Sequence, residues 1–489
     1  MLRGHILGVV RWPTLVKWTR AIPVGLVVGL WSISVPLFAS PDEPANFVKG
    51  AALVRGEVVG SAVAPELLKS YWTTVVDIDP QFGSVNGLPW CFAPYPDKPA
   101  CTYDVATAPQ VDGVAWTNMG KYPPLGFLLT GLGTVFGPTN LSVYASRFIQ
   151  SVACISLLLA CAKVLRGRDR SMIGFLLAVT PGTIFLASTA SPSGLEIIAS
   201  IAMWVTAPFV LGTASTSFER RIFLVGGVLL IGVRPLGLIF YLAVVAVTMF
   251  IGRVSPRAGL QRIGIKLLLT HGAVATFMLW WYFSIYGPAT KNKIEFGDIP
   301  LSLGQQLHAI VRGLPRIVEQ YVGNFGWLDT PAPQVVVWIA VASVLALFVV
   351  TWKIGSGRDL VSIVLLLACS TAFTIAADLN YYDLLRTFGS QGRHVAPFLV
   401  GIPVLLGARI SRRSWFIPWL GLGWAISVAW SFGVMIRRYS VGVTPGNIGQ
   451  MWNDPPWVPP LGVSVTFGAM ILAVGASLIV LWREESTRH

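Results

Sequence analysis

The sequence predicts an all-α polytopic membrane protein, and three observations lead to this fold class. Of the 489 residues, 54% are hydrophobic and only 12% are charged, whereas a soluble domain carries roughly 25% charged residues. The mean hydropathy of the whole chain is +0.67. Apolar runs of about 20 residues, the length that crosses a bilayer as a helix, recur from end to end. A soluble multidomain protein does not fit this composition.

Basic residues between the apolar runs predict the orientation. They cluster at 166–170, 220–221, 253–266, 353–358 and 409–413, which is the positive-inside pattern of cytoplasmic loops. No cleavage motif follows the first run, which we expect to remain as a helix. Both termini are then cytoplasmic. About twelve transmembrane helices are predicted, at 21–39, 143–165, 171–190, 195–213, 222–233, 236–252, 263–286, 333–353, 360–378, 394–410, 415–436 and 461–482.

The segment 122–137 is ambiguous, because it is apolar but short and rich in glycine. If it crossed the membrane as a thirteenth span, every later basic cluster would move to the outer side. An interfacial or re-entrant helix is therefore predicted here. Its start at Pro123-Pro124 suits a helix N-terminus.

This layout places large outer loops after the first and seventh helices. We expect a core module at 1–286 that contains the first outer loop, 40–142. A second outer loop at 287–332 and a C-terminal transmembrane module at 333–489 follow. Most acidic residues fall on the outer side, so any chemistry is expected to face outward.

The net charge of +14 does not indicate nucleic acid binding, because the cations lie in short loops between apolar runs. The chain has no Walker A or Rossmann glycine motif. Its predicted cytoplasmic loops are too short to bind a nucleotide-sugar. An activated substrate is therefore expected to come from the membrane.

The cysteines predict one disulfide and no metal centre. Cys154, Cys161 and Cys369 lie in apolar runs, where a thiol behaves as a small hydrophobe. Cys91 and Cys101 both lie in the first outer loop, on the oxidising side, where a disulfide between them is predicted.

The adjacent carboxylates Asp42 and Glu43 are the first candidates for chemistry. They lie where the first helix leaves the membrane, and charge at the lipid interface is costly. Pro41 and Pro44 keep the pair out of a helix interior. The pair either marks the start of a loop or forms the centre of an active site. The residues after Pro44 predict an amphipathic helix along the outer membrane surface.

Two further positions lie near predicted outer helix ends. Arg234 interrupts an apolar run and needs an anionic partner, either a structural carboxylate or a ligand phosphate. Lys121 and Tyr122 are either interfacial anchors, which are common in membrane proteins, or contacts to the phosphate and sugar of a ligand.

The second half of the chain offers two more candidate segments. Trp327 and Asp329 suit stacking on a sugar and binding of its hydroxyls, or alternatively an interface anchor and a helix N-cap. Arg393 begins the predicted helix at 394–410, where both its guanidinium and the helix N-terminus suit a phosphate. Gln391 is a candidate sugar or acceptor contact, and His394 titrates near neutral pH.

Several motifs, in this order, resemble a bacterial membrane-protein family catalogued as domain of unknown function 2142. The resemblance covers about residues 30–410. This chain has Ser193 where members often have Asp, and His394 where members usually have Tyr. The motifs are SPDEPANFVKG, KYPPLGFLL, ASRF, TPGTIFLASTASPSG, NFGWLD and QGRHVAPFL.

That family is similar to the GT-C membrane glycosyltransferases, in which a carboxylate of the first outer loop is catalytic. The resemblance implies an inverting transfer of a sugar from a polyprenyl-phosphate donor to a cell-envelope glycan or glycolipid. The reaction would occur on the outer face of the bacterial cytoplasmic membrane. The GT-C core also has large outer loops after its first and seventh spans, as in the layout predicted here.

The resemblance also implies roles for the candidate residues. Asp42 is expected to be the base. Glu43 is expected to support it or to help bind a divalent cation, Mg²⁺ or Mn²⁺, the one cofactor considered. The donor phosphate is expected to contact Arg393, His394, Arg234 and Lys121. The sugar or acceptor is expected to contact Tyr122, Trp327, Asp329 and Gln391.

Two other functions remain as alternatives. A flippase or transporter of lipid-linked sugars would need charges along a path through the bilayer, and the centres of most predicted spans have none. A non-catalytic scaffold for envelope assembly would tolerate changes at Asp42 and Glu43. The sequence does not predict an oligomeric state.

Overall fold

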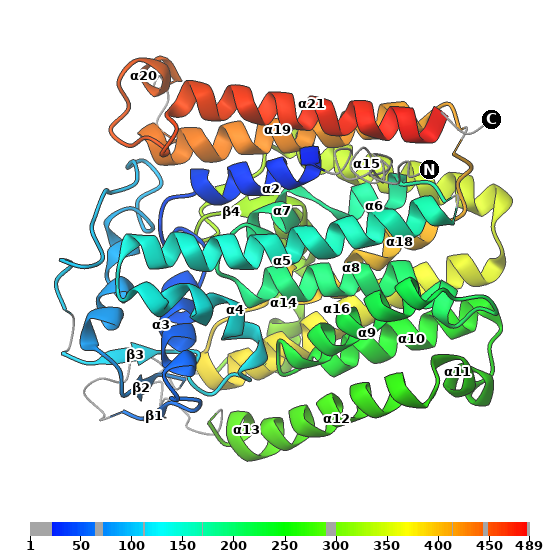
Figure 1. Cartoon of the computed structure of the whole chain (residues 1–489), viewed down its shortest axis with the longest axis horizontal. Helices are drawn as coiled ribbons and strands as arrows, with labels where there is room; N and C mark the ends of the chain where they lie inside the picture. The colour runs from blue at the N-terminus through cyan, green and yellow to red at the C-terminus, as the bar shows by residue number, and fades with distance from the viewer. Residues whose placement is uncertain are drawn as a thin grey trace, which may run out of the picture.

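The computed structural model describes residues 22–63, 72–110, 113–168, 170–289, 300–412, 414–443 and 448–486. It is a bundle of long, roughly parallel helices with small strands at one end (Figure 1). The basic N-terminal residues, Arg413 and the last three residues lie outside the described part of the chain.

Seven of the described helices are long and apolar enough to cross a membrane. An eighth results if α10 (Gly237–Gly252) and α11 (Pro256–Ile263), which meet at a bend of 114°, count as one span. The chain is thus a multi-pass helical membrane protein, as predicted. The seven are α5 (Asn140–Gly167), α8 (Pro192–Val210), α12 (Ile265–Trp281) with its π-helical continuation η5 (Tyr282–Tyr286), α15 (Gln334–Ile354), α16 (Gly357–Leu385), α19 (Ile417–Val441) and α21 (Val463–Ser486).

Two of the about twelve predicted spans are broken rather than continuous helices. The segment 171–190 forms two short helices, α6 (Ile173–Ala178) and α7 (Pro181–Ala187), because Pro181 cannot continue a helix and Thr180 caps the next one. The segment 394–410 likewise forms α17 (Gly392–Leu399) and α18 (Gly401–Gly407). The described part of the first predicted span forms α2 (Ile22–Ser34). Another predicted span, 222–233, lies in α9 (Ser217–Gly232), whose 16 residues are fewer than the about 20 of a typical crossing.

The ambiguous segment 122–137 forms α4 (Leu125–Gly133) and the short turn η4 (Thr134–Phe136). Nine helical residues rise only about 14 Å, less than half of the hydrocarbon core. α4 packs closely on α3 (Glu43–Val54), where a Cβ atom on Gly131 would lie 2.5 Å from the carbonyl oxygen of Gly50. The length agrees with a helix that does not span.

The helices alternate in direction, so the basic loops gather at one end of the bundle. Arg170 donates a hydrogen bond to the carbonyl oxygen of Ala408 at 2.9 Å, and Arg358 donates one to that of Phe250 at 2.9 Å. These two hydrogen bonds join segments that are far apart in the sequence. We call this the basic end, and we call the opposite end, which carries the strands, the strand end (Figure 1).

The strand end contains the two large predicted loops. In the first, β1 (Ser61–Ala62), β2 (Thr74–Val76) and β3 (Ala115–Thr117) form an antiparallel sheet in that order, with η2 (Pro80–Asn86) and η3 (Leu88–Cys91) between β2 and β3. In the second, β4 (Asn324–Phe325) and β5 (Thr330–Pro331) form a hairpin. The remaining short helices are α13 (Gly287–Ala289) and α20 (Ile448–Asn453).

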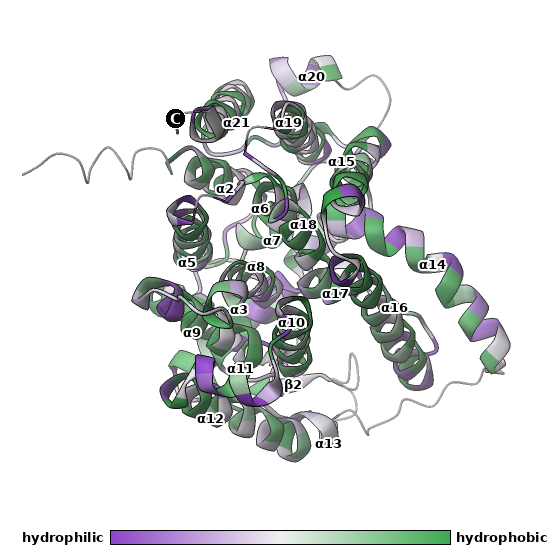
Figure 2. Ribbon diagram, turned by 90° about the vertical axis from the view of Figure 1, so that its right-hand side faces the viewer, coloured by the Kyte–Doolittle hydropathy of each residue, from purple (hydrophilic) through white to green (hydrophobic). Residues whose placement is uncertain are grey.

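The second loop also contains α14 (Leu303–Gly323), a 21-residue helix that the sequence analysis did not predict. Polar and apolar residues alternate along α14, which extends away from the bundle in Figure 2. Ile310 and Ile317 are buried on its inner side. The helix was missed because its polar face lowers the hydropathy by which spans are identified.

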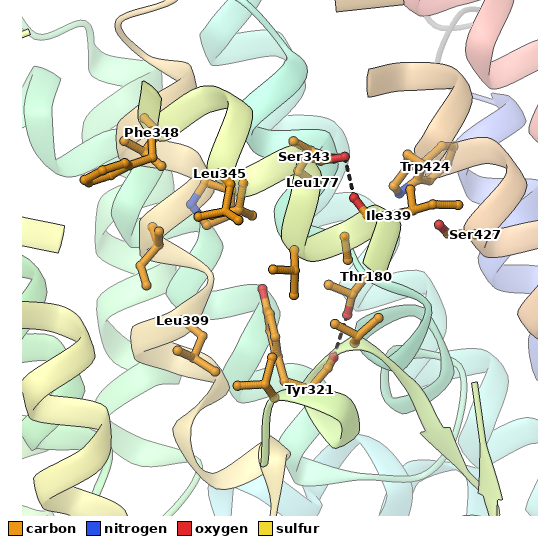
Figure 3. A pocket seen from close by; sticks show the side chains of 18 of the residues that line it. Leu177, Thr180, Tyr321, Ile339, Ser343, Leu345, Phe348, Leu399, Trp424 and Ser427 are labelled. Carbon is orange, nitrogen blue, oxygen red and sulfur yellow. Dashed lines mark hydrogen bonds between the residues drawn. The ribbon is translucent and has the colours of Figure 1, made fainter. Parts of the chain in front are cut away.

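The core surrounds α8, which is the most buried of the seven long helices. Neighbours cover it on all sides, so the polar residues at its N-terminus face protein. A separate apolar cavity of about 390 Å³ lies between α14, α15, α16, α18 and α19 (Figure 3). At its edge, the hydroxyl of Thr180 donates to the carbonyl oxygen of Tyr321 at 2.9 Å.

Candidate active site

Six of the ten predicted site residues line one cavity of about 150 Å³ at the strand end. We call it the Asp42 cavity. Its walls come from the start of α3, the start of α8, the turn between α9 and α10, the end of α16 and the start of α17. The six predicted residues are Asp42, Tyr122, Arg234, Gln391, Arg393 and His394. The other lining residues are Asn46, Trp72, Asn118, Met119, Phe127, Ser191, Pro192, Ser193 and Tyr381.

Asp42 and Arg393 form an ion pair on the cavity wall. Nη2 of Arg393 donates to Oδ2 of Asp42 at 2.6 Å, and the two side chains are 11% and 36% exposed. Nη1 of Arg393 lies 3.5 Å from the carbonyl oxygen of Pro41. Asp42 therefore presents a partly exposed carboxylate beside a cation.

The backbone of Asp42 explains why its side chain is available. Asp42 has a φ of +61°, in the left-handed region, and stands at the N-cap of α3 without capping that helix through its side chain. Such a conformation is costly for a residue other than glycine and is often found at functional sites. The carboxylate is turned away from α3.

Glu43 points elsewhere and has a structural role. It is fully buried, and its two carboxylate oxygens accept hydrogen bonds from Nε and Nη2 of Arg147, each at 2.7 Å. Arg147 also donates to the carbonyl oxygens of Val35 and Pro36. The pair therefore anchors the chain that leads to Asp42. This burial and pairing favour a supporting role for Glu43 over a direct role in catalysis.

The predicted metal site at Asp42 and Glu43 is not formed. Glu43 uses both oxygens on Arg147, so Asp42 is the single carboxylate of the cavity wall. Within the described ranges, no three His, Cys, Asp or Glu side chains come together as metal ligands would. The donor set does not fit a Mg²⁺ or Mn²⁺ ion held by this pair.

Arg234 has a structural carboxylate as partner, one of the two alternatives that the sequence left open, and it also lines the Asp42 cavity. Its Nη1 lies 3.4 Å from Oε2 of the buried Glu196 and 3.4 Å from the hydroxyl of Ser193. The Arg234 side chain is still 21% exposed and lines the Asp42 cavity. Glu196 thus supplies the structural carboxylate, and a face of the guanidinium remains directed at the cavity.

The N-terminus of α8 completes a wall that favours anions. Ser191, Pro192 and Ser193 line the cavity where this helix of 19 residues begins. The first N–H groups of a helix and its dipole attract negative charge. The hydroxyl of Ser191 is buried and has no hydrogen-bond partner among the described residues. Arg234 and Arg393 line the same cavity.

Besides Glu43, three predicted site residues do not line this cavity. Trp327 donates from its indole to the carbonyl oxygen of Phe38 at 3.0 Å, and Asp329 accepts from Nε of Arg438 at 2.8 Å. Lys121 is adjacent to Tyr122 in sequence but is not part of the wall. Trp327 and Asp329 thus have partners in other parts of the protein, and the predicted ligand contacts of these three residues stay predictions.

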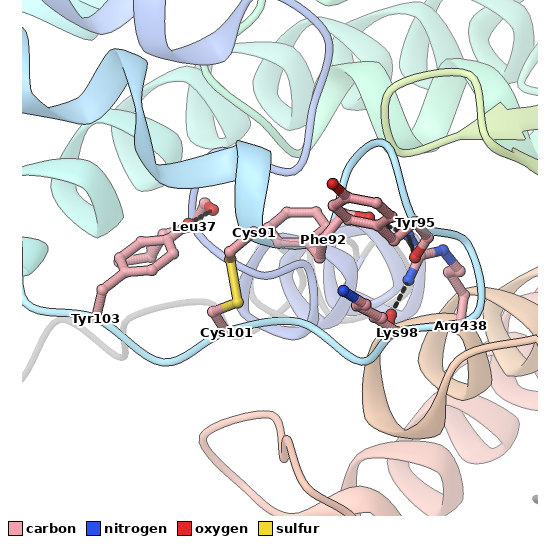
Figure 4. The surroundings of a disulfide bond; sticks show 8 residues. All are labelled: Leu37, Cys91, Phe92, Tyr95, Lys98, Cys101, Tyr103 and Arg438. Carbon is pink, nitrogen blue, oxygen red and sulfur yellow. Dashed lines mark hydrogen bonds between the residues drawn. A yellow bond between two sulfur atoms is a disulfide. The ribbon is translucent and has the colours of Figure 1, made fainter.

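Arg438 connects these loops to the disulfide. It is fully buried and donates to the carbonyl oxygens of Lys98 and Phe92 at 2.5 and 2.9 Å. Both lie in or beside the loop that the disulfide between Cys91 and Cys101 closes (Figure 4). Arg438, Asp329 and the disulfide together hold the first loop on α19.

Lys49 was predicted on the polar face of a surface helix, and this prediction is wrong. α3 is buried along most of its length by α4, β3 and η2. Nζ of Lys49 donates to the carbonyl oxygens of Val58 and Gly120 at 2.6 and 2.9 Å. Burial, and next the charge of Lys121, lower the pKa of Lys49 to about 8. Neither this role nor that of Arg147 was identified from the sequence, although the motifs SPDEPANFVKG and ASRF contain both residues.

Comparisons with known proteins support the conclusion that this chain is a membrane protein. A family model described as "Predicted membrane protein (DUF2142)" matches residues 26–402. No curated protein matches the chain. A crystal structure of ArnT from Cupriavidus metallidurans bound to undecaprenyl phosphate is 12% identical, with 98% of this chain and 78% of that chain covered and a TM-score of 0.43. ArnT in the apo state gives 12% identity, 96% and 78% coverage and a TM-score of 0.45. Likeness at this level assigns no site or substrate.

Proposed function

The chain belongs to the DUF2142 family of membrane proteins, and we propose that it is a membrane glycosyltransferase. In this proposal it moves a sugar from a polyprenyl-phosphate donor to a glycan or glycolipid of the cell envelope. The observation that carries the proposal is the Asp42–Arg393 pair on the wall of the Asp42 cavity.

The Asp42 cavity suits the phosphate of such a donor. Arg393 and Arg234 offer guanidinium groups, whose fork of donors matches phosphate oxygens. The start of α8 adds backbone N–H groups on the same cavity wall. A phosphate that contacts Arg393 would share its guanidinium with Asp42, so donor binding loosens the hold of Arg393 on the carboxylate.

Asp42 is the proposed base. The acceptor hydroxyl oxygen forms a bond to the anomeric carbon while the bond from that carbon to the phosphate oxygen breaks. The bonding electrons leave with the polyprenyl phosphate, and the hydroxyl proton passes to the Asp42 carboxylate. A positioned base contributes typically ~10²–10⁴-fold to such a step. Arg393 and Arg234 stabilise the charge that develops on the leaving phosphate.

The proposed location follows from the two ends of the bundle. Loops rich in Lys and Arg lie at the basic end, and the positive-inside rule supports a cytoplasmic position for that end. The Asp42 cavity at the strand end would then face outward from the bacterial cytoplasmic membrane. A lipid-linked donor suits this side, because nucleotide-sugars are confined to the cytoplasm.

The proposal is tested by sugar transfer from synthetic polyprenyl-phosphate sugars. The full chain in liposomes is expected to release polyprenyl phosphate and label a cell-envelope glycan fraction. A scaffold would do neither, and a flippase would move the lipid across the bilayer without breaking its sugar–phosphate bond.

A further inference from the structure

We propose that a second cavity, on the other side of Arg393, binds the glycan acceptor and directs one hydroxyl toward Asp42. This inference rests on the proposed glycosyltransferase function. The second cavity has a volume of about 300 Å³ and lies between the end of α14, the β4–β5 hairpin and the start of α15. We call it the α14 cavity.

The lining of the α14 cavity combines polar and charged side chains with apolar ones. Arg316, Glu319, Gln320, Asn324 and Gln334 all contribute to it. Guanidinium, carboxylate and amide groups together donate and accept hydrogen bonds, which suits a molecule rich in hydroxyl groups. The α14 cavity has one guanidinium group, whereas the Asp42 cavity has two, so a phosphate suits the Asp42 cavity better.

A small space lies between the two cavities and shares lining residues with both, and we call it the connection. Its volume is about 20 Å³. It shares Gln320, Asn324 and Leu328 with the α14 cavity, and Gln391 and Arg393 with the Asp42 cavity. A space of this size holds about one water molecule. It therefore admits a single hydroxyl group, whereas a sugar ring would have to stay in the α14 cavity.

Two residues that line this connection, Asn324 and Gln391, each have a buried acceptor oxygen without a hydrogen-bond partner among the described residues. The amide of Asn324 donates through Nδ2 to the carbonyl oxygen of Leu328 at 3.1 Å, which leaves its buried Oδ1 without a partner among the described residues. The buried Oε1 of Gln391 also lacks one in that part of the chain. Buried acceptors without a donor are costly, and a hydroxyl proton would satisfy one of them.

The connection borders the start of α17, the helix that carries Arg393. Oε1 of Gln320 accepts a hydrogen bond from the backbone N–H of Gly392 at 2.9 Å, and Arg393 follows directly. Pro41, the residue before Asp42, also borders the small space. A hydroxyl group that enters from the α14 cavity therefore arrives beside Arg393, whose guanidinium is hydrogen-bonded to Asp42.

The remainder of an acceptor has room outside the cavity. Arg316, Pro331 and Gln334 are exposed at its edge, so a larger glycan can extend outward from them. The apolar cavity in Figure 3 offers few hydrogen-bonding groups and does not suit a glycan. The acceptor class is thus a hydroxyl-rich glycan, with its reacting hydroxyl at the connection and its proton passing to Asp42 during transfer.

The test compares acceptor and donor dependence in cavity variants. The full chain in liposomes receives a ¹⁴C-labelled polyprenyl-phosphate sugar at saturation, and the envelope glycan fraction of the producing bacterium is titrated as the acceptor probe. The variants are Asn324→Leu, which blocks the connection, and the exposed double change Arg316→Ala with Gln334→Ala. Arg312→Ala is the control, since Arg312 lies one turn earlier on α14 and does not line the cavity.

Both cavity variants are expected to raise the half-saturating acceptor concentration about tenfold or more. They should leave the Kd for undecaprenyl phosphate within twofold of the wild type, and the control should change neither value. An unchanged acceptor dependence in the double variant, with normal transfer by the wild type, would overturn the acceptor assignment alone. Absence of transfer by the wild type would instead refute the glycosyltransferase function, and the assignment with it.

Discussion

Nη2 of Arg393 lies 2.6 Å from Oδ2 of Asp42, although the two residues are 351 positions apart in the sequence. The pair joins the first loop of the chain to the start of α17, and so links the two modules expected at 1–286 and 333–489. Each residue borders the Asp42 cavity. The pair combines a proton acceptor with a phosphate-binding group at one point.

Replacement of Arg393 should weaken donor binding. Arg393→Ala removes one of the two guanidinium groups of the cavity, and we expect the Kd for undecaprenyl phosphate to rise about tenfold or more, as the loss of a charge-assisted contact predicts. Arg393→Lys should restore part of the affinity, because it keeps the charge but not the fork. Binding can be measured by the change in intrinsic tryptophan fluorescence. An unchanged Kd in Arg393→Ala would remove this residue from the phosphate site.

The buried pair of Glu43 and Arg147 should control stability. Arg147→Met leaves the Glu43 carboxylate buried without its partner, which typically costs about 3–5 kcal/mol of unfolding free energy. The double change Arg147→Met with Glu43→Gln should recover part of this loss, because no buried charge remains. Thermal unfolding in detergent, followed by circular dichroism, measures both effects. Equal losses in the single and double variants would contradict a coupled pair.

Lys49 should make stability depend on pH above neutrality. Its pKa is about 8 in the folded protein and about 10.4 in an unfolded chain. Between these values the unfolded state binds more protons, so the free energy of unfolding rises as pH increases from 8 to 10.5. The rise is at most about 3 kcal/mol. Lys49→Met should flatten the profile in this window, and a wild-type stability that falls between pH 8 and 10 relative to Lys49→Met would contradict the lowered pKa.

The disulfide should hold the first loop in place. Replacement of Cys91 and Cys101 by Ser opens a short loop, for which chain entropy predicts a loss of about 3 kcal/mol. Chymotrypsin should then cleave faster after Phe92, which lies in that loop and is buried in the folded protein. Cys369→Ser, at an exposed free cysteine, is the matched control and should change neither property. Equal cleavage rates in the presence and absence of the disulfide would show that Arg438 alone anchors the loop.

Local sequence patterns predicted most of the long helices and six residues that line the Asp42 cavity. Apolar runs located most of the long helices, and charges at helix ends identified Asp42, Arg234 and Arg393. Runs of hydropathy could not reveal the break at Pro181, because the residues on both sides of it are equally apolar. The search for apolar runs also did not detect α14, because polar and apolar residues alternate along this helix.

The partners of the charged residues could not be predicted in the same way. Glu43 meets Arg147 across 104 positions, and Lys49 meets Gly120 across 71. Such contacts depend on how helices pack, which no local pattern encodes. The sequence held one signal of these contacts. Arg147 and Lys49 lie within largely buried helices, and buried charges require partners.

The most direct test of the central claim is sugar transfer by Asp42→Asn. The full-length variant and the wild type are placed in liposomes with a labelled polyprenyl-phosphate sugar and the envelope glycan fraction. Asp97→Asn, an exposed acid of the same loop, serves as the matched control. If Asp42 is the base, Asp42→Asn lowers the transfer rate by ~10²–10⁴-fold while its thermal unfolding and its Kd for undecaprenyl phosphate stay close to those of the wild type. A folded Asp42→Asn protein that transfers sugar at the wild-type rate would contradict the claim.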